Sequence, residues 1–227
     1  MRTDQTEQFP PIFVISLKNS PRRDIIAQRL NGLKLNFKFI DGINGKTLSQ
    51  DELNNIDYTF YPQRFAARKP LTVGEIGCAM SHLSIYQMMC NEKIARAIIL
   101  EDDAIVSHEF EAIVKDSLKK VSKNVEILFY DHGKAKSYCW KKTLVENYRL
   151  VHYRKPSKTS KRAIMCATAY LITLSGAQKL LQIAYPIRMP ADYLTGALQL
   201  TGLKAYGVEP PCVFKGAISE IDAMEQR

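Results

Sequence analysis

The chain has 227 residues, of which 46% are hydrophobic and 24% are charged, and its formal net charge is +9. This composition excludes disordered and fibrous proteins, and the length suits one substantial α/β domain over residues 1–227. No apolar run approaches the roughly 20 residues that are needed to cross a bilayer, so we expect no membrane-spanning helix.

The N-terminal segment and the cysteines point to a reducing compartment. Residues 1–9 are polar, the opposite of the basic start and apolar middle of a signal peptide. The five cysteines are odd in number and form no C-x-x-C pair, which argues against a disulfide framework and a zinc knuckle. We expect a cytoplasmic protein with small, buried apolar thiols. They are Cys78, Cys90, Cys139, Cys166 and Cys212.

Apolar runs separated by turn residues predict strands that alternate with helices. We expect strands at 12–17, 37–40, within 95–106, at 125–130, 163–174 and 204–208, and an edge strand at 212–214. We expect helices at 22–32, 47–55 (capped by Ser49), 75–91, 109–120, 175–184 and 194–201, an irregular segment at 57–70 and a turn at 189–193. The first strand, helix and strand fit the minimal right-handed parallel unit, which indicates a nucleotide-type α/β fold.

Three acidic residues, Glu101, Asp102 and Asp103, follow the apolar run of the expected central strand. Open α/β sheets bind ligands beyond the carboxyl ends of their strands, where these side chains should emerge. Carboxylates held this close repel one another unless they are protonated, hydrogen-bonded or neutralised by a cation. Mg²⁺ or Mn²⁺ suits such oxygen ligands and could hold a substrate diphosphate. The alternative is a solvated acidic turn after a core strand.

Other polar residues lie at expected strand ends and helix starts. Asp41 ends the second strand, where an acid often accepts a hydrogen bond from a nucleoside. Arg22 follows the first strand and could meet phosphate, although an arginine in a first helical turn is usually solvated. Gly74 opens the segment G-E-I-G-C-A-M-S-H, whose glycines allow close backbone approach to a ligand. His82 ends that segment, and a lone histidine there is more often structural than a general base.

Asp131 and Asp192 are the two candidates for a general base. Asp131 closes the strand expected at 125–130, and Asp192 lies in a turn next to Pro190. Transfer of a group to a hydroxyl needs a carboxylate close to that hydroxyl to take its proton. Their spacing in the sequence does not rank these two residues.

A basic and aromatic segment occupies residues 134–162, where ten Lys or Arg accompany a single acid, Glu146. Three partners would explain it: nucleic acid, an anionic membrane surface, or a phosphorylated or acidic substrate. A solvated loop without any partner is the fourth interpretation.

Five segments in order resemble the family 25 glycosyltransferases, which include bacterial lipopolysaccharide and lipooligosaccharide galactosyl- and glucosyltransferases. They are V-I-S-L-x₄-R-R-D (14–24), F-I-D-G-I-N-G (39–45), G-E-I-G-C-A-M-S-H (74–82), I-L-E-D-D-A (99–104) and A-T-A-Y-L-I-T-L-S-G-A-Q-K-L-L (167–181). Together they extend over about the first four-fifths of the chain. Two features depart from the family: Ala104 replaces a larger apolar residue, and residues 134–162 carry no matching motif.

The resemblance implies an α/β fold of GT-A type, which binds a nucleotide-sugar on a mostly parallel central sheet flanked by helices. It implies inverting transfer of galactose or glucose from a UDP-sugar to a lipooligosaccharide or lipopolysaccharide acceptor. The acidic triplet becomes the counterpart of a DxD-like motif, with Asp103 and Glu101 as ligands of Mn²⁺ or Mg²⁺. The implied donor-site residues are Ser16, Leu17, Arg22, Asp41, Asn44, Gly74, Glu75, Ser81, His82, Glu101 and Asp102.

Three classes of function compete. The first is a metal-dependent glycosyltransferase, peripheral on the inner face of a bacterial inner membrane, with residues 134–162 facing the acceptor or anionic lipid. The second is a catalytically silent, transferase-like binding module, against which the intact acidic triplet argues. The third is a nucleic-acid binder, indicated by charge alone and without a recognisable motif. We expect the first, with the hexose, linkage, acceptor and oligomeric state left open.

Overall fold

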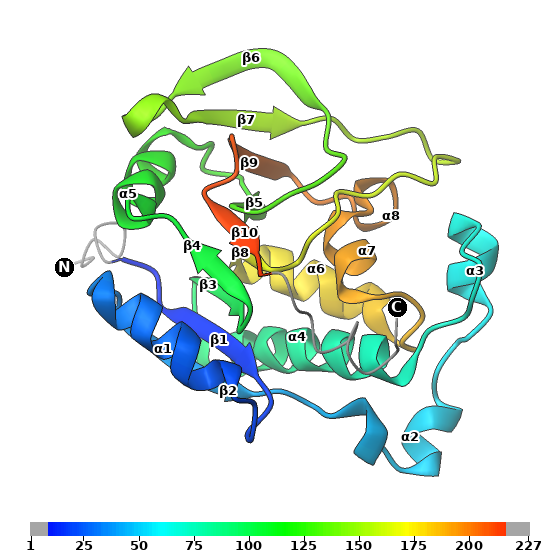
Figure 1. Cartoon of the computed structure of the whole chain (residues 1–227). Helices are drawn as coiled ribbons and strands as arrows, with labels where there is room; N and C mark the ends of the chain where they lie inside the picture. The colour runs from blue at the N-terminus through cyan, green and yellow to red at the C-terminus, as the bar shows by residue number, and fades with distance from the viewer. Residues whose placement is uncertain (1–8, 217–227) are drawn as a thin grey trace.

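A computed structural model describes residues 9–216 around an eight-stranded sheet of order β2-β1-β3-β8-β5-β9-β7-β6 (Figure 1). Its strands are β1 (Ile12–Ser16), β2 (Phe37–Asp41), β3 (Arg96–Glu101), β5 (Ile127–Phe129), β6 (Ser137–Thr143), β7 (Arg149–Tyr153), β8 (Ala169–Thr173) and β9 (Ala205–Glu209). A second sheet pairs β4 (Ala104–Val106) with β10 (Val213–Lys215). The helices are α1 (Arg22–Gly32), α2 (Gln50–Asn54), α3 (Phe60–Phe65), α4 (Val73–Glu92), α5 (Phe110–Lys120), α6 (Leu174–Ala184), α7 (Ala191–Gly196) and α8 (Leu198–Thr201), with the short 3₁₀ turns η1 (Gly45–Thr47) and η2 (Val145–Asn147).

The central sheet is mixed, but most of its strands share one direction. β1 runs parallel to β2 and β3, and β5 runs parallel to β9. β8 is antiparallel to β3 and β5, and β7 is antiparallel to β9 and β6. Six strands of the described sheet therefore point one way, and β7 and β8 point the other. The predicted α/β fold with a mostly parallel central sheet flanked by helices is confirmed.

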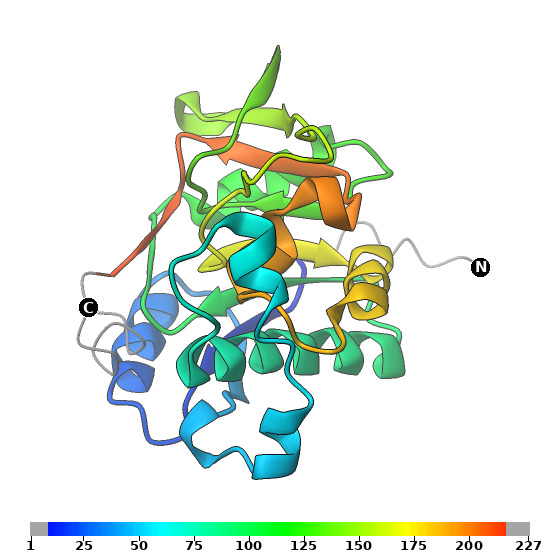
Figure 2. The ribbon, with the colours of Figure 1, turned by 90° about the vertical axis from the view of Figure 1, so that its right-hand side faces the viewer.

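Alternation along β1 divides the apolar side chains between two cores. Ile12 and Val14 pack with residues of α1 and α5 on one face of the sheet, whereas Phe13 and Ile15 pack with α4 and α6 on the other. Figure 2 shows α4 and α6 over the face that is turned toward the viewer. A strand covered on both faces has to be apolar throughout, which explains the uninterrupted I-F-V-I run.

Side-chain caps fix the start of α2 and α4. Ser49 and Glu52 form a reciprocal capping box on α2, as expected for Ser49, and Thr72 and Glu75 form another on α4. Such caps contribute about 0.5–2 kcal/mol each by satisfying backbone N–H groups that have no partner inside the helix. The start of α4 is therefore held in one place, close to the carboxyl ends of the strands.

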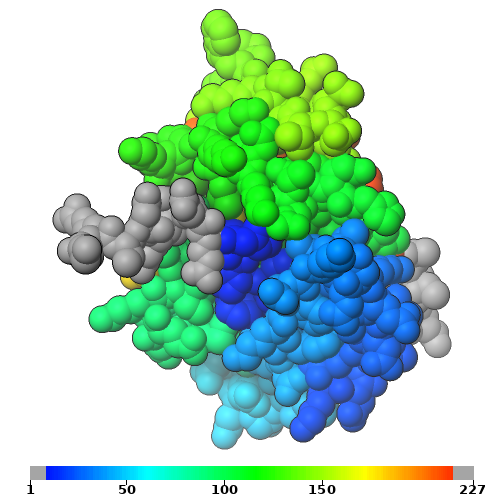
Figure 3. Space-filling view, turned by 90° about the vertical axis from the view of Figure 1, so that its left-hand side faces the viewer, coloured from blue at the N-terminus to red at the C-terminus, as the bar shows by residue number. Residues whose placement is uncertain are grey.

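The structure differs from the sequence-based expectations in several segments. Residues 57–70 are not irregular throughout, because they contain α3, whose Phe60 and Phe65 rings meet edge to face at 6.5 Å. The turn expected at 189–193 leads directly into α7, and β4 after the acidic triplet was not predicted. Within residues 134–162, β6 and β7 form a hairpin at the edge of the sheet. In Figure 3 this yellow-green hairpin projects beyond the rest of that face.

The environment of the cysteines corrects one further expectation. All five are free thiols; Cys212 is buried as predicted, whereas Cys78, Cys90 and Cys166 are only partly buried. Cys139 is exposed, because β6 carries exposed side chains along nearly its whole length. Among residues 9–216, no helix combines the length and the apolar character that crossing a membrane requires.

Two glycines let the loop after β2 lie directly on α4. A Cβ at Gly77 would be 2.5 Å from the Ile43 carbonyl oxygen and 2.6 Å from the Gly45 nitrogen. A Cβ at Gly45 would be 1.7 Å from the Val73 carbonyl oxygen. No side chain fits at such distances, so glycine is required at both positions. Gly77 therefore admits the chain's own loop, where the sequence led us to expect the close approach of a ligand.

We predict that Gly77→Ala lowers the free energy of unfolding by about 1–3 kcal/mol, because the added methyl group has to displace backbone atoms. Urea unfolding followed by circular dichroism measures this. Gly32→Ala in α1 is the matched control, since a Cβ there meets nothing within 4 Å. The control should be neutral or stabilising by up to about 1 kcal/mol. Equal stability of the two variants would contradict the proposed packing.

Candidate active site

The carboxyl ends of three adjacent strands bring polar residues to one edge of the sheet. The strand register pairs Ser16 with Asp41 and Ile15 with Glu101. Asp41 therefore shares this edge with the acidic triplet, as the parallel arrangement predicted. Open α/β sheets bind their ligands at this kind of edge.

A pocket of about 110 Å³ lies at this edge, between the ends of β1 and β3, the loop after β2 and the start of α4. The predicted site residues that line it are Ser16, Leu17, Arg22, Asn44, Gly74, Ser81, Glu101, Asp102 and Asp103. The predicted residues outside its lining are Asp41, Glu75, His82, Asp131 and Asp192. The volume is below the roughly 300 Å³ of typical small-ligand pockets, so a larger ligand has to extend along the edge or displace a side chain.

Asp102 is held by the neighbouring strand and helix. Ser16 Oγ donates a hydrogen bond to Asp102 Oδ2 at 2.6 Å, and Arg22 Nη2 lies 3.0 Å from Asp102 Oδ1. Arg22 Nη1 also lies 3.9 Å from Asp103 Oδ2. These contacts compensate the charge of a buried carboxylate and fix its position. The Arg22 side chain is therefore part of the acidic site rather than solvated.

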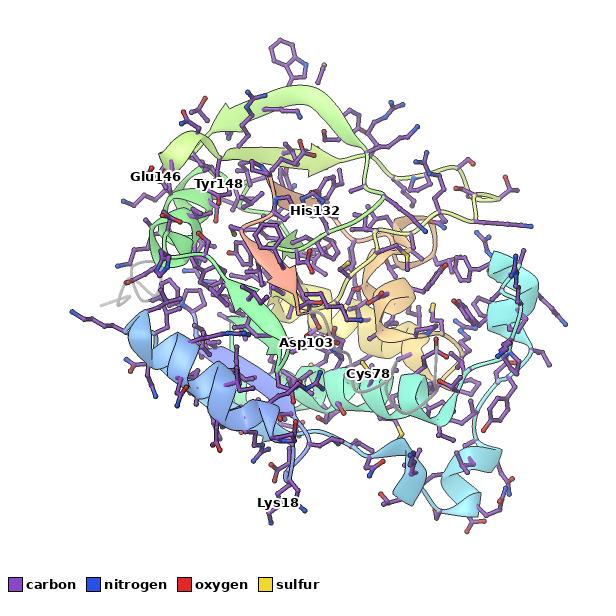
Figure 4. The ribbon with its side chains drawn as sticks, viewed as in Figure 1. Lys18, Cys78, Asp103, His132, Glu146 and Tyr148 are labelled. Carbon is purple, nitrogen blue, oxygen red and sulfur yellow. The ribbon has the colours of Figure 1, made fainter. Side chains whose placement is uncertain are left out.

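Asp103 differs from Asp102 because one of its oxygens lacks a partner. The residue is 7% exposed, and its Oδ1 atom is buried without a hydrogen bond in the described part of the chain. Burial, followed by the charge of Glu101, raises the pKa of Asp103 to about 7. Figure 4 places Asp103 in the middle of the molecule, near Cys78 of α4. A buried, unpartnered carboxylate oxygen beside two further carboxylates fits a hard divalent cation.

Glu101 faces α4. Its Oε1 atom lies 3.3 Å from His82 Nε2 and accepts a hydrogen bond from the Cys78 thiol at 3.5 Å. Burial is the largest single influence and raises the pKa of Glu101, but His82, Lys215 and the Cys78 hydrogen bond together outweigh it, so the pKa is lowered. Tyr170 fixes the histidine from the other side, with its hydroxyl 2.7 Å from His82 Nδ1. His82 is thus a buried residue that positions Glu101.

Cys78 is a site residue that the sequence analysis missed. The ligand atoms of Cys78, His82 and Glu101 lie within 4.8 Å of one another. Sulfur and nitrogen make this a softer ligand set than carboxylates alone, and Zn²⁺ accepts such a combination. The sequence did contain a signal for Cys78: it lies four residues before His82, a spacing that places both side chains on one helix face. No sequence signal indicated the contact of Tyr170 with His82, because 88 positions separate them.

Ser81 and Asn44 shape the loop that forms one wall of the pocket. Ser81 Oγ accepts a hydrogen bond from the Ile43 N–H at 2.8 Å and donates one to the Gly77 carbonyl at 2.7 Å. The Asn44 side chain accepts a hydrogen bond from the Lys46 N–H at 3.0 Å, which caps η1. Ser81 therefore holds the loop on α4, Asn44 fixes the turn within the loop, and both residues line the pocket.

Asp41 and Glu75 already have partners within the chain. Asp41 forms an ion pair with Arg23, and its side chain is 62% exposed. The Glu75 carboxylate accepts a hydrogen bond from the Thr72 N–H at 2.9 Å as part of the helix cap. A contact of either residue with a nucleotide-sugar stays a prediction.

Asp131 and Asp192 form a second acidic group beside Glu101. Burial raises the pKa of Asp131 to about 6, and one of its oxygens, Oδ2, is buried without a partner among residues 9–216. Burial, followed by the charge of Glu101, also raises the pKa of Asp192, whose Oδ1 accepts a hydrogen bond from the Ala167 N–H at 2.8 Å. The charge of Asp192 contributes to the raised pKa of Asp131, so the two carboxylates lie within electrostatic reach of each other. The geometry does not rank them as bases.

The chain belongs to glycosyltransferase family 25. The model of this family, described as glycosyltransferase family 25 (LPS biosynthesis protein), matches residues 9–195. The match covers most of the 227 residues, including every predicted site residue. The expected family is thereby confirmed.

Several animal proteins are similar to this chain. Human procollagen galactosyltransferase 2 is 28% identical over 184 residues, which cover 76% of this chain and 27% of that protein. Its mouse counterpart is 28% identical over 233 residues, covering 91% and 35%. Human inactive glycosyltransferase 25 family member 3 is 29% identical over 194 residues, covering 81% and 31%. This chain thus spans about a third of the length of these relatives.

We predict that the stability of the cation-free protein falls as the pH rises from about 4 to about 7. In this range the unfolded chain releases the proton of Asp103, whose usual pKa is 3.8, while the folded protein retains it up to a pKa of about 7. Asp103→Asn should reduce this decline, leaving the part that comes from the raised pKa of Asp131 and of Asp192, and should stabilise the protein by about 1–3 kcal/mol at pH 8. Urea unfolding with a chelator measures both effects.

Asp24→Asn is the control for this experiment, because Asp24 is an exposed carboxylate on α1. It should leave the pH dependence unchanged. The same pH dependence of stability in the wild type and in Asp103→Asn would contradict the raised pKa of Asp103.

Proposed function

We propose that the protein is an inverting, metal-dependent glycosyltransferase that moves galactose, or glucose, from a UDP-sugar to a lipooligosaccharide or lipopolysaccharide acceptor. The observation that carries this proposal is the buried Oδ1 atom of Asp103, which has no hydrogen-bond partner among residues 9–216 and belongs to three successive carboxylates at the ligand-binding edge of the sheet. Membership of family 25 supports glycosyl transfer as the reaction.

The proposed sugar and acceptor are supported by the names of similar proteins and by the description of the family. Two similar proteins are named procollagen galactosyltransferases, which supports galactose as the transferred sugar. The family description names lipopolysaccharide biosynthesis, which supports a bacterial glycolipid acceptor rather than collagen. The absence of a membrane-spanning helix in residues 9–216 is compatible with peripheral attachment to the inner membrane, which stays a prediction.

Asp103 and Glu101 would hold Mn²⁺ or Mg²⁺ in this proposal. The cation would neutralise the charge that develops on the UDP leaving group and would orient its diphosphate. Asp102 would not need to ligate directly, because Ser16 and Arg22 already contact both of its oxygens. Arg22 lines the pocket at this edge, where a guanidinium pairs well with phosphate oxygens.

The proposed reaction is a single displacement. The acceptor hydroxyl attacks the anomeric carbon, the bond from that carbon to the diphosphate oxygen breaks, and UDP leaves with the electron pair. A carboxylate takes the proton of the hydroxyl. Asp192 and Asp131 both have a raised pKa, which makes them stronger proton acceptors once they are ionised. Asp192 is our first choice.

A catalytically silent binding module is the second candidate. It is favoured by one observation, the similarity of this chain to human inactive glycosyltransferase 25 family member 3. The complete set of carboxylates argues against it, since a site free of selection would be expected to lose ligands.

A donor assay separates these two functions without knowledge of the acceptor. We predict that one of UDP-galactose, UDP-glucose and UDP-N-acetylglucosamine is slowly hydrolysed to UDP with Mn²⁺ but not with a chelator. Asp103→Asn should reduce this turnover by at least about 100-fold while remaining folded, because a ligand of the cation is lost.

The Asp24→Asn variant again serves as the control and should retain full turnover. If Asp103→Asn turned over the donor at the wild-type rate, the assignment of Asp103 as a ligand of the cation would be wrong. No turnover of any donor, together with no thermal stabilisation by UDP and Mn²⁺, would favour the silent module.

We predict that Asp192→Asn lowers the turnover number by at least about 100-fold and leaves the donor affinity within about threefold. The asparagine can still accept the Ala167 hydrogen bond, so the fold should be kept while the base is lost. Steady-state kinetics and calorimetric UDP binding measure the two quantities.

Unchanged turnover in Asp192→Asn would assign the base to Asp131. In that case the turnover of the wild type should decrease as the pH is lowered through about 6, the pKa of the Asp131 carboxyl. Asp131→Asn should then abolish turnover.

A further inference from the structure

A second pocket, of about 380 Å³, lies apart from the acidic edge of the sheet. Five basic residues line it, together with two serines; they are Lys134, Lys136, Arg154, Lys155, Arg162, Ser157 and Ser160. Its floor consists of the buried apolar residues Ala163, Ile164 and Leu198 beside Gly196. Neither the family motifs nor the proposed donor site accounts for this pocket. Its volume falls within the range of about 300–1,000 Å³ that small-ligand sites occupy.

Within residues 9–216, no ion pair compensates the charge of this pocket. No Asp or Glu lines it, and none of its five basic side chains forms an ion pair with another residue of the range 9–216. Arg154 lies over the ring of Tyr138 at 5.8 Å, a contact that leaves its charge in place. Cations gathered around a partly apolar cavity focus a positive field and attract anions.

Hydrogen bonds from outside the pocket fix its wall. Gln199 Nε2 on α8 donates to the carbonyls of Ser160 and Arg162 at 3.0 and 2.8 Å. Arg64 Nη2 on α3 donates to the carbonyl of Lys158 at 2.7 Å. These bonds hold the backbone of the loop at 156–162 from two helices, so the wall that carries Arg162 is in place without any ligand. A preformed site has less conformational entropy to lose when it binds.

The pocket adjoins the segments that carry the candidate bases. Gly133, two residues after Asp131, forms a backbone bridge with Met165. Ile164 donates to the Gly196 carbonyl on α7 at 3.0 Å, and α7 also carries Asp192. The basic pocket and the two carboxylates thus share the same two chain segments. A molecule whose hydroxyl lies at Asp192 or Asp131 could extend into the basic pocket.

We propose that this pocket binds a phosphate group carried by the acceptor saccharide, an inference that rests on the proposed transferase function. A guanidinium group can donate two parallel hydrogen bonds to two oxygens of one phosphate, and lysine ammonium groups and serine hydroxyls supply further hydrogen-bond donors. The apolar floor suits the carbon-bound face of a sugar ring next to that phosphate. A nucleic acid would instead need a groove that follows many phosphates, which a bounded cavity does not offer.

Calorimetric titration of the full chain with glucose 6-phosphate and with glucose tests the proposal. We expect binding of glucose 6-phosphate, and of inorganic phosphate, and none of glucose at the same concentrations. Arg154→Gln/Arg162→Gln should weaken the binding of glucose 6-phosphate at least tenfold, while its UDP-sugar hydrolysis stays at the wild-type rate.

The matched control is Lys119→Gln/Lys123→Gln, which removes two exposed cations at and just after the end of α5. It should bind glucose 6-phosphate as the wild type does. Equal loss in both double variants would overturn the proposal, because it would show non-specific attraction by net charge. Equal affinity for glucose and glucose 6-phosphate, or no binding of either, would also overturn it.

Vesicles of phosphatidylglycerol distinguish a lipid headgroup from a sugar phosphate. If Arg154→Gln/Arg162→Gln loses vesicle binding but keeps glucose 6-phosphate binding, the pocket is a membrane contact and the proposal is overturned. If glucose 6-phosphate binds at this pocket but no UDP-sugar is hydrolysed, the phosphate site stands and the transferase function fails. The two ideas can therefore fail separately.

Discussion

Repulsion between three successive carboxylates is the constraint on which the architecture of this site depends. The chain compensates two of them with its own groups: Asp102 by Ser16 and Arg22, and Glu101 by His82. Asp103 has Arg22 at 3.9 Å and the charge of Lys215 nearby, but its buried Oδ1 atom has no hydrogen-bond partner among residues 9–216. The unfavourable energy of burying charge is thus concentrated on one residue. A cation bound there would relieve it, which couples ligand binding to stability.

Ordinary features of the fold produce this distribution. β1 and β3 are direct neighbours, so Ser16 at the end of one strand reaches Asp102 just after the other. α4 crosses the same edge and presents His82 and Cys78 to Glu101 from a single helix face. The glycine contacts between α4 and the loop after β2 keep the helix at this distance. Each partner of a carboxylate therefore comes from an element that the apolar cores fix in place.

Local patterns allowed the sequence to predict β1, α1, β2, α4 and β3, together with the shared edge of Asp41 and the acidic triplet. The features that the sequence did not predict either join residues far apart in the chain or have no recognisable sequence pattern. The Tyr170 contact with His82 joins residues 88 positions apart, and the Arg22 contact with Asp102 depends on how β1 and β3 pair. The hairpin of β6 and β7 was missed because β6 is exposed and polar, without the alternation that marks a half-buried strand.

The acidic and basic pockets differ in how far they depend on the core. The acidic pocket is built on central strands and on α4, so a substitution there disturbs several packed elements at once. The basic residues of the second pocket lie just before β6, just after β7 and in the loop at 156–162, where exposed side chains can change with little effect on stability. In a transferase, that division would let acceptor recognition vary while the donor chemistry stays constant. The absence of a family motif in residues 134–162 is what such a division of roles would produce.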